Sequence, residues 1–406
     1  MANLEKFASF NGSKNTRVQV IKHHGNVNAV LQGLGWNWVT EEGCANYLPD
    51  EAVLLPEKEA DALLNAATQL YDLMVAAVPD DLPADFLQIL DIPENLWPII
   101  RQSWNDDRHW HLYGRFDLVQ TPEGPKLLEF NADTATSIPE TAVVQWASLA
   151  AAGKNEAAQA SGLYEALVEQ LANWRSRNDD LAPNLVLTYI GESTEDRTNC
   201  EVIAQAAREA GFEAFLFPID ELTFSTEGAD RGVWGEVGKD EWLEFPFVFK
   251  LLPWEQIAWE EPELAEDLAS LMLTRNVVVA NPPYTLIWQS KGFLAWLWKA
   301  YPHHPLLLET ALEPIPGKYI RKPFFGREGQ NVQVVDQKIV DEKEGEYANQ
   351  KFVYQAWVDL PQDDQGNLYQ AGVFWAGEGC AIGLRREKGI ITNLSQFLPH
   401  LLDINR

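Results

Sequence analysis

Residues 184–218 constrain the fold more than any other part of the chain. The run NLVLTYIG predicts a buried strand, TEDRTNCEVIAQAAREAG a helix that ends at Gly211, and FEAFLFPI a second strand. Two strands joined by one helix are typical of a parallel α/β unit, because the helix carries the chain back to the starting edge of the sheet. A further apolar run, FPFVFKLLPW, predicts another strand.

The rest of the chain mixes helices with antiparallel patterns. Residues 57–78 predict an amphipathic helix, and Leu163, Leu167, Leu171 and Trp174 mark a later one. After Ser290 a short helix, KGFLAWLWKAY, precedes five strand candidates separated by turn residues: KYIRKPFF, NVQVVD, KFVYQAWVDLP, GVFWAG and AIGLRRE. The expected fold class is therefore a mixed α/β (α+β) fold.

Charge and hydropathy exclude several partners. The 406 residues include 31 Lys and Arg against 60 Asp and Glu, a net charge of −29. This balance excludes general binding to nucleic-acid phosphates and argues against attachment to anionic membranes. It suits a cationic substrate, although acidity alone usually serves solubility. No apolar run approaches the roughly 20 residues that span a bilayer.

A cytoplasmic location is expected from the cysteines and the N-terminus. Cys44, Cys200 and Cys380 do not make a disulfide framework or a zinc cluster. The sequence begins MANLEKFASFNGSKN, which has no apolar signal core.

Residues 111–133 predict a hairpin with one polar face, HLYGRFDLVQ and KLLEFNAD around the turn TPEGPK. A turn centred on Glu123 places Asp117 opposite Glu129 and Arg115 opposite Asn131. The other face then sends four apolar side chains to the core: Phe116, Leu118, Leu128 and Phe130.

Two interpretations of this polar face are open. Carboxylates opposed across strands repel unless a cation lies between them, and carboxylate and amide oxygens suit Mg²⁺. The alternative is a solvent-facing hairpin on which Arg115 neutralises the acids.

A second candidate is the loop in KYIRKPFFGREGQNVQVV. Gly326 and Gly329 let backbone approach a phosphate, and Lys322 and Arg327 supply positive charge. It is not a Walker A loop, because it lacks GK[ST] and a strand follows. The alternative is a tight hairpin with an incidental glycine pair.

Three further features have plain structural alternatives. Lys291 begins a helix and is either functional or solvated. Gln355 is either a site residue or part of an ordinary core strand. The acidic run within residues 251–274, which contains Glu255, most simply forms a solvated helix face.

Taken together, ten stretches from Arg101 to His400 carry a family resemblance: RQSW, GRFDL, KLLEFNADTATSIPE, FVFKLLPWE, NPPYTLIWQSKGFLAWLW, YPHHPLLL, KYIRKPFFGREGQNV, VYQAWVDLP, GLRREKGIIT and FLPH. In this order they resemble the synthetase domain of glutathionylspermidine synthase and its stand-alone relatives, within the ATP-grasp superfamily. EFNADT and KPFFGREGQNV are the specific motifs.

The resemblance implies an ATP-grasp fold with a preATP-grasp-like α/β subdomain and an antiparallel nucleotide-binding and lid region. Its segments are an N-terminal helical part (1–110), the catalytic hairpin and helices (111–183), the α/β subdomain (184–285), and the nucleotide-binding and lid region (286–406). All four are expected to form one catalytic unit.

The resemblance also implies roles for individual residues. Arg115, Phe116 and Asp117 would lie at the ATP and Mg²⁺ site, with Glu129 and Asn131 completing the metal ligands. Lys291 and Lys322 would contact phosphates and Gly329 would lie in the lid, while Gln355, Ile390 and Ile391 would border the nucleotide. Arg327, together with Arg115, would stabilise the transferring phosphoryl group. Thr134 and Arg385 would face the acyl substrate.

The implied function is ATP-dependent joining of a glutathione-like or peptide-like acid to a polyamine-like amine through an acyl phosphate. Two alternatives are a peptide ligase with an amino acid acceptor and a non-catalytic nucleotide-binding relative. The partners are small molecules, and the sequence does not indicate an oligomeric state. Residues 1–113 precede GRFDL without the motif of the amidase domain that bifunctional members carry, so amidase activity is not expected.

Overall fold

The computed structural model describes residues 17–22, 27–33, 47–154, 158–191, 193–392 and 394–404. Its strands form one parallel sheet, two five-stranded antiparallel sheets and two small three-stranded sheets. The mixed α/β class expected from the sequence is confirmed. Strands of the predicted 111–183 and 286–406 segments share one sheet.

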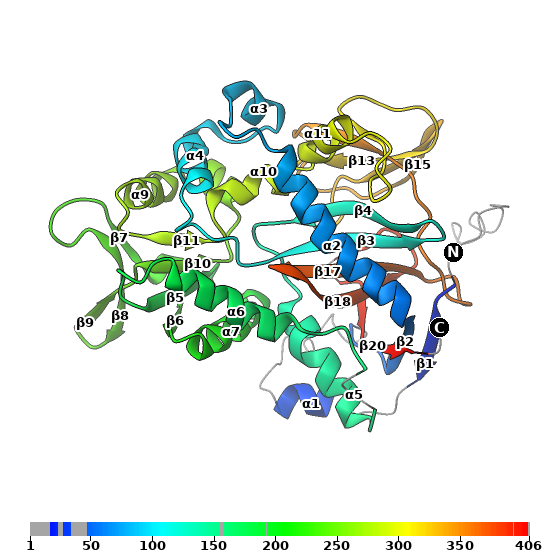
Figure 1. Cartoon of the computed structure of the whole chain (residues 1–406), viewed down its shortest axis with the longest axis horizontal. Helices are drawn as coiled ribbons and strands as arrows, with labels where there is room; N and C mark the ends of the chain where they lie inside the picture. The colour runs from blue at the N-terminus through cyan, green and yellow to red at the C-terminus, as the bar shows by residue number, and fades with distance from the viewer. Residues whose placement is uncertain are drawn as a thin grey trace.

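The parallel sheet has the order β11-β10-β5-β6 and is built from β5 (Asn184–Tyr189), β6 (Glu213–Pro218), β10 (Phe247–Lys250) and β11 (Val278–Ala280). Helix α7 (Thr194–Glu209) connects β5 to β6, and α6 (Leu163–Ser176) lies beside it (Figure 1). The hydroxyl of Ser193 accepts a hydrogen bond from the Asp196 backbone amide at 3.2 Å and so caps α7. The predicted parallel α/β unit is confirmed.

The central antiparallel sheet has the order β19-β18-β17-β3-β4. It comprises β3 (Gly114–Thr121), β4 (Gly124–Asn131), β17 (Leu368–Ala376), β18 (Glu378–Glu387) and β19 (Gln396–Leu398). The long helix α2 (Glu57–Ala77) crosses one face of this sheet (Figure 1). Its buried side includes the predicted apolar positions Leu63, Ala67, Leu70 and Met74.

The second antiparallel sheet has the order β12-β16-β13-β14-β15. It comprises β12 (Thr310–Ala311), β13 (Tyr319–Pro323), β14 (Gln333–Asp336), β15 (Lys338–Glu342) and β16 (Phe352–Ala356), and α11 (Gly292–Ala300) packs against it. All five strand candidates of the last quarter are confirmed.

The remaining elements surround these three sheets. One small sheet contains β1 (Gln19–Lys22), β2 (Glu51–Pro56) and β20 (His400–Asp403), and the other contains β7 (Thr223–Ser225), β8 (Gly232–Gly238) and β9 (Glu241–Glu244). The other helices are α1 (Val27–Gly33), α3 (Ala84–Ile89), α4 (Trp97–Asn105), α5 (Gln145–Ala151), α8 (Trp254–Glu260), α9 (Pro262–Leu273) and α10 (Leu286–Gln289). Single helical turns span Glu94–Leu96, Glu140–Val144, Ile219–Glu221 and Pro283–Thr285.

The β3–β4 hairpin has the predicted pairs but reaches them by a different route. Arg115 pairs with Asn131 and Asp117 with Glu129, while the turn lies one half-residue earlier than assumed, since Thr121 pairs with Gly124. A β-bulge at Leu128 restores the register by adding one residue to β4.

The prediction that Leu128 goes to the core is therefore wrong. Leu127 is buried in its place, and Leu128 lines the cavity described below.

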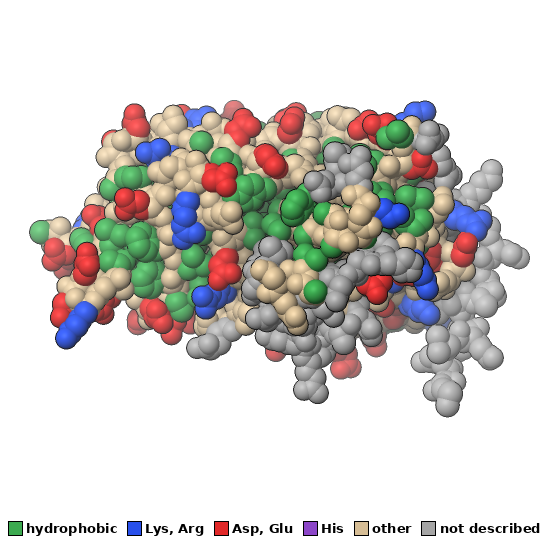
Figure 2. Space-filling view, turned by 90° about the horizontal axis from the view of Figure 1, so that it is seen from below, with side chains coloured by type: hydrophobic (Ala, Val, Ile, Leu, Met, Phe, Trp, Pro, Cys, Tyr) green, Lys and Arg blue, Asp and Glu red, His purple; other side chains and the backbone are tan. Residues whose placement is uncertain are grey.

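The surface shows the acidity of the chain. Figure 2 shows Asp and Glu side chains spread over one face with Lys and Arg among them. In the described ranges, no helix combines the length and apolar character needed to cross a membrane. Cys200 and Cys380 are free thiols, and Cys44 lies outside the described residues.

His400 is a buried histidine that folding requires to be neutral. Its Nε2 accepts a hydrogen bond from the Ala160 backbone amide at 2.9 Å, so the ring proton lies on Nδ1. Burial lowers the pKa of His400 from 6.5 to about 4. Between pH 6.5 and 4, His400 is therefore protonated in the unfolded chain but stays neutral in the folded chain.

We expect the free energy of unfolding to fall as the pH drops from 6.5 toward 4, by up to about 3 kcal/mol for this residue. His109 and His111, whose pKa values burial also lowers to about 4, add to the slope. Urea unfolding across this range checks it: His400→Gln should flatten the slope, and the exposed control His303→Gln should not. A full wild-type slope in His400→Gln would contradict the assignment.

Candidate active site

A cavity of about 1970 Å³ is lined by residues of both five-stranded sheets and of the loops beside them. It brings together side chains from positions 115 to 391, as the sequence predicts for a single site. The predicted site residues that line it are Arg115, Asp117, Glu129, Asn131, Thr134, Lys291, Lys322, Arg327, Gly329, Gln355, Arg385, Ile390 and Ile391.

Phe116 is the exception among the predicted site residues. Its ring is fully buried on the opposite face of β3 and stacks on Phe130, with 3.8 Å between ring centroids. The alternation of side chains along the strand requires this placement. Any contact of Phe116 with a nucleotide is therefore left to its backbone.

Arg115 and Asp117 form an ion pair on the cavity face of β3. The Arg115 Nε lies 2.8 Å from Asp117 Oδ1, and Nη1 donates to the Thr136 carbonyl at 2.9 Å. Burial opposes the charge of Arg115, but Asp117 outweighs it and raises the pKa of the guanidinium. Asp117 is only 4% exposed, so the alternative of a solvent-facing hairpin is wrong.

Gly372 makes room for this pair. It lies on β17 opposite Asp117, and a Cβ atom there would lie 2.9 Å from Arg115 Cδ. A glycine at this position lets the arginine side chain lie across the neighbouring strand. Its role was not predicted, because the sequence does not show which strand lies beside β3.

Glu129 lies beside two buried ammonium groups. Lys291 Nζ is 3.6 Å and Lys322 Nζ 3.9 Å from its Oε2. Burial alone would raise the pKa of Glu129, but the two lysines outweigh it and hold that pKa below its usual value. Lys291 also donates to the Gly326 carbonyl at 2.7 Å, so the alternative of a solvated Lys291 is wrong.

The Gln355 side chain is held by two hydrogen bonds in the cavity wall, so it is more than a residue of an ordinary core strand. Its Oε1 accepts from Lys322 Nζ at 3.0 Å, and its Nε2 donates to the Leu127 carbonyl at 3.4 Å. Lys322 Nζ also donates to the carbonyl of Leu128, the bulged residue of β4, at 3.1 Å. The bulge thus supplies an acceptor that helps to hold Lys322 in the cavity wall.

The loop between β13 and β14, residues 324–332, is called the lid loop below. Gly329 has a φ of 70°, and a Cβ there would lie 3.0 Å from Ile390 Cγ2 and 3.1 Å from the Ile391 carbonyl oxygen. The loop therefore packs closely on the 390–391 segment, which counts against an incidental glycine pair. Arg327 extends from it into the cavity.

The far end of the cavity carries charges of both signs. Arg385 donates to the Ser137 hydroxyl at 2.6 Å and to the Ser395 carbonyl at 3.2 Å. Burial raises the pKa of Glu195 to about 7, the Glu140 carboxylate adds to the shift, and Arg385 opposes it. A ligand with both a carboxylate and an ammonium group finds complementary partners here.

Glu255 departs from the prediction of a solvated acidic helix face, whereas Glu260, Glu261, Glu263 and Glu266 are exposed as expected. It is 3% exposed, and its Oε1 lies 2.6 Å from Arg327 Nη2. Its helix begins directly after a buried ion pair, Asp133 with Lys250, whose atoms Oδ1 and Nζ are 2.8 Å apart. The signal was present in FVFKLLPWE, where a lysine ends an apolar strand and is costly to bury unpaired.

The donor set for a metal ion consists of oxygen atoms. Among the described residues, no cluster of three or more His, Cys, Asp and Glu side chains has the arrangement of a metal site. The predicted set instead combines two carboxylates with the amide of Asn131, whose Nδ2 lies 3.4 Å from Asp117 Oδ2. These side chains lie on one face of the β3–β4 hairpin and line the cavity, so they suit Mg²⁺, which accepts few protein ligands besides water and phosphate oxygens.

The two ion pairs of Glu129 predict how removal of its charge affects stability. In the absence of ligand, Glu129 offsets the charge of two buried lysines, so Glu129→Gln should lower the free energy of unfolding by about 1–3 kcal/mol. Urea denaturation of the ligand-free protein measures this. Glu123→Gln, an exposed change in the same hairpin, is the control. A gain in stability would instead show that repulsion between Asp117 and Glu129 dominates.

Comparison with known proteins agrees with this picture. The "Bifunctional glutathionylspermidine synthetase/amidase" of Escherichia coli (strain K12) is 28% identical over 352 residues, which cover 82% of this chain and 56% of that protein. The "Putative acid--amine ligase" of Haemophilus influenzae is 27% identical over 90% of this chain and 93% of its own length. The chain thus spans about half the length of the bifunctional relative.

One more relative and one solved structure extend the comparison. The "Trypanothione synthetase" of Crithidia fasciculata is 27% identical over 83% of this chain and 54% of its own length. A glutathione synthetase-like effector from Globodera pallida aligns over 87% of this chain and 89% of its own, with a TM-score of 0.49 and 10% identity.

A family model identifies the family that the motifs suggested. The model described as "Glutathionylspermidine synthase preATP-grasp" matches residues 18–403, nearly the whole chain. The chain belongs to the glutathionylspermidine synthase preATP-grasp family.

Proposed function

We propose that the protein is an ATP-dependent ligase that forms an amide between a carboxylic acid and an amine through an acyl phosphate. The observation that carries this proposal is the pair of buried ammonium groups, Lys291 and Lys322, that approach the same oxygen of Glu129 in one cavity. Buried cations that share one carboxylate retain positive charge for a polyanionic ligand. The synthetase and ligase names of the relatives support the proposal.

The proposed reaction has two steps. The carboxylate of the acid attacks the γ-phosphorus of ATP, the bond to the β–γ bridging oxygen breaks, and ADP leaves. The amine then attacks the carbonyl carbon of the acyl phosphate, loses a proton, and expels inorganic phosphate. No covalent enzyme nucleophile is required. The chain contributes positioning and charge, which dominate catalysis of phosphoryl transfer.

Individual residues have distinct parts in this scheme. Lys291 and Lys322 neutralise the nucleotide phosphates, and Arg327 and Arg115 stabilise the charge of the transferring phosphoryl group. Gln355 and the 390–391 segment border the nucleotide beneath Gly329. Closure of the lid loop excludes water, which would otherwise hydrolyse the acyl phosphate.

Asp117, Glu129 and Asn131 would hold Mg²⁺, whose chemistry is to neutralise phosphate oxygens during transfer. All three line the cavity on one face of the β3–β4 hairpin, and both carboxylates already lie among cations. Without nucleotide the metal should bind weakly, because it needs phosphate oxygens to complete its shell.

The substrates that fit best are a glutathione-like or peptide-like acid and a polyamine-like amine. Thr134 and Arg385 would receive the acid, and the carboxylates of Glu195 and Asp196 line the same cavity on the side open to an ammonium group. The net charge of −29 also favours a cationic substrate. Such small molecules are metabolites of the cytoplasm, where we infer the protein acts.

Two other functions are weaker. A peptide ligase with an amino acid acceptor uses the same ATP chemistry and differs only in the amine. A non-catalytic nucleotide-binding relative predicts loss of a metal ligand or of the lid arginine, yet Asp117, Glu129, Asn131 and Arg327 are all present.

ADP release across a matrix of small acids and amines tests the proposal. We expect slow ADP formation with ATP and Mg²⁺ alone and much faster formation with one correct acid–amine pair, with the amide found by mass spectrometry. An amino acid that replaces the polyamine would support the peptide-ligase alternative. ATP consumption that yields a phosphorylated amine would contradict ligation.

Arg327→Ala tests the role of the lid loop. Turnover should fall about a thousandfold, the scale seen when an arginine that stabilises a phosphoryl group is removed. The KM for ATP should change little, because a charge used in the transition state adds little to ground-state binding. Arg175→Ala, an exposed change on α6, is the control. Equal losses of binding and turnover would make Arg327 a ground-state ligand.

A further inference from the structure

Arg327 connects the lid loop to two segments that are far apart in the sequence. Its Nη1 donates to the Thr134 hydroxyl at 3.0 Å, and its Nη2 donates to Glu255 Oε1 at 2.6 Å. Thr134 follows β4, whereas Glu255 lies in the first turn of α8. The guanidinium therefore links the segment after β4 to the helix α8.

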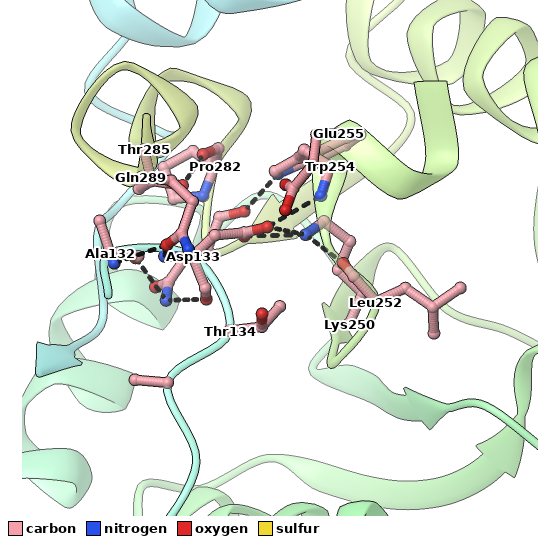
Figure 3. Close-up of polar contacts among 12 residues, drawn as sticks. Ala132, Asp133, Thr134, Lys250, Leu252, Trp254, Glu255, Pro282, Thr285 and Gln289 are labelled. Atoms are coloured by element: carbon pink, nitrogen blue, oxygen red, sulfur yellow. Dashed lines mark hydrogen bonds and ion pairs between the residues drawn. The ribbon is translucent and has the colours of Figure 1, made fainter. Parts of the chain in front are cut away.

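The start of α8, the helix that carries Glu255, is anchored by a buried ion pair. Asp133 accepts hydrogen bonds from Lys250 Nζ at 2.8 and 3.1 Å, and its Oδ2 also accepts from the Trp254 backbone amide at 2.9 Å. Lys250 additionally donates to the Leu252 carbonyl at 2.8 Å and lies 4.4 Å from the centroid of the Trp254 ring. Figure 3 shows Asp133 between Lys250 and the start of α8, with Glu255 next to it.

The Glu255 carboxylate accepts a hydrogen bond from Arg327 through one of its two oxygens. Its side chain is 5% exposed, and its Oε2 is buried without a hydrogen-bond partner. A buried carboxylate with one orphaned oxygen is unfavourable for folding alone. The guanidinium offsets part of that penalty, and the arrangement points to a role for the carboxylate beyond stability.

We propose that Glu255 is a positioning residue for the reaction: it fixes the Arg327 guanidinium of the lid loop beside the cavity, from the start of α8, which Asp133 anchors through the Trp254 backbone amide. This inference rests on the proposed function, in which Arg327 acts on the phosphoryl group. It assigns to Glu255 a role through Arg327, without contact between Glu255 and the substrate.

The physical reason is the mobility of an arginine on a glycine-containing loop. A free arginine side chain loses about 2 kcal/mol of rotamer entropy when it is fixed, and loop backbone adds to that loss. A partner that fixes the guanidinium before substrate binds removes this loss from the reaction barrier. The negative charge of Glu255 also weakens the electrostatic effect of Arg327 on the phosphoryl group. The proposal therefore requires that fixing the guanidinium lowers the reaction barrier by more than this weakening raises it.

Two measurements on the full chain separate position from fold. The first is hydrogen exchange of the amides of residues 324–331 in the ligand-free protein, which needs no activity. Glu255→Ala and Arg327→Ala should each accelerate exchange in this loop about tenfold or more, the double variant no further, and Glu255→Gln less. Glu263→Gln, an exposed change on the neighbouring helix α9, should leave exchange unchanged.

The second measurement is a double-mutant cycle on turnover with the substrate pair found above. Glu255→Ala should lower kcat about 10- to 100-fold, the range for one hydrogen bond to a charged group, with little change in the KM for ATP. In the Arg327→Ala background the same change should have almost no effect. Glu255→Gln retains an acceptor and should recover part of the loss.

The outcomes are distinguishable. Unchanged exchange in Glu255→Ala and Glu255→Gln overturns the proposal whatever the activity. Faster exchange with unchanged or higher kcat also overturns it, because the field of the carboxylate then matters more than the position. Losses that simply add to those of Arg327→Ala show a structural role only. Faster exchange in a protein with no acid- and amine-dependent ADP release supports the contact and contradicts the proposed function.

Discussion

A buried ion pair joins the central antiparallel sheet, which lines the cavity, to the parallel sheet. Asp133 follows β4 of the central sheet, Lys250 ends β10 of the parallel sheet, and both side chains are almost fully excluded from solvent. Such a pair stabilises little by itself, because both charges lose their hydration. It is specific, however, because an alternative packing of the sheets would leave each charge buried without a partner.

Asn281 completes this junction next to the ion pair. Directly after β11, its amide donates to the carbonyls of Tyr113 and Asp133 and accepts from the Leu112 backbone amide. The approach to β3 and the exit from β4 are therefore both held by the parallel sheet. The contacts of Asn281 and of the Asp133–Lys250 pair therefore help to fix the position of the polar face of the hairpin.

Sequence patterns predicted local structure well and long-range burial poorly. The two-residue period of the hairpin was enough to place Asp117 and Glu129 on one face, since alternation is a local property of any strand, but their pairing also depended on the assumed position of the turn. The bulge at Leu128 could not be predicted. It shifts the register by one residue, the earlier turn compensates for this shift, and the polar pairs are the same with or without both changes. The small sheet β7–β9 was likewise absent from the predicted organisation.

The candidate site shows the same division. Most predicted residues line one cavity because the motifs that carry them were specific, whereas the burial of Glu255 was missed. A run of acids on a helix looks solvated unless one knows which loop covers it. Arg327 is 72 positions further along the chain, and only the tertiary fold brings the two together.

The cavity wall is far less acidic than the chain as a whole, because nine Lys and Arg residues line it together with ten Asp and Glu residues. Its wall contains Arg115, Lys291, Lys322, Arg327 and Arg385, although the chain carries −29 overall. Burial lowers the pKa of Lys322, and the charge of Lys291 lowers it further, while Glu129 opposes the shift. Stability alone would favour apolar residues at such positions. Under the proposed function, the phosphates of ATP would offset the cost of these buried cations, which accounts for their gathering on one wall.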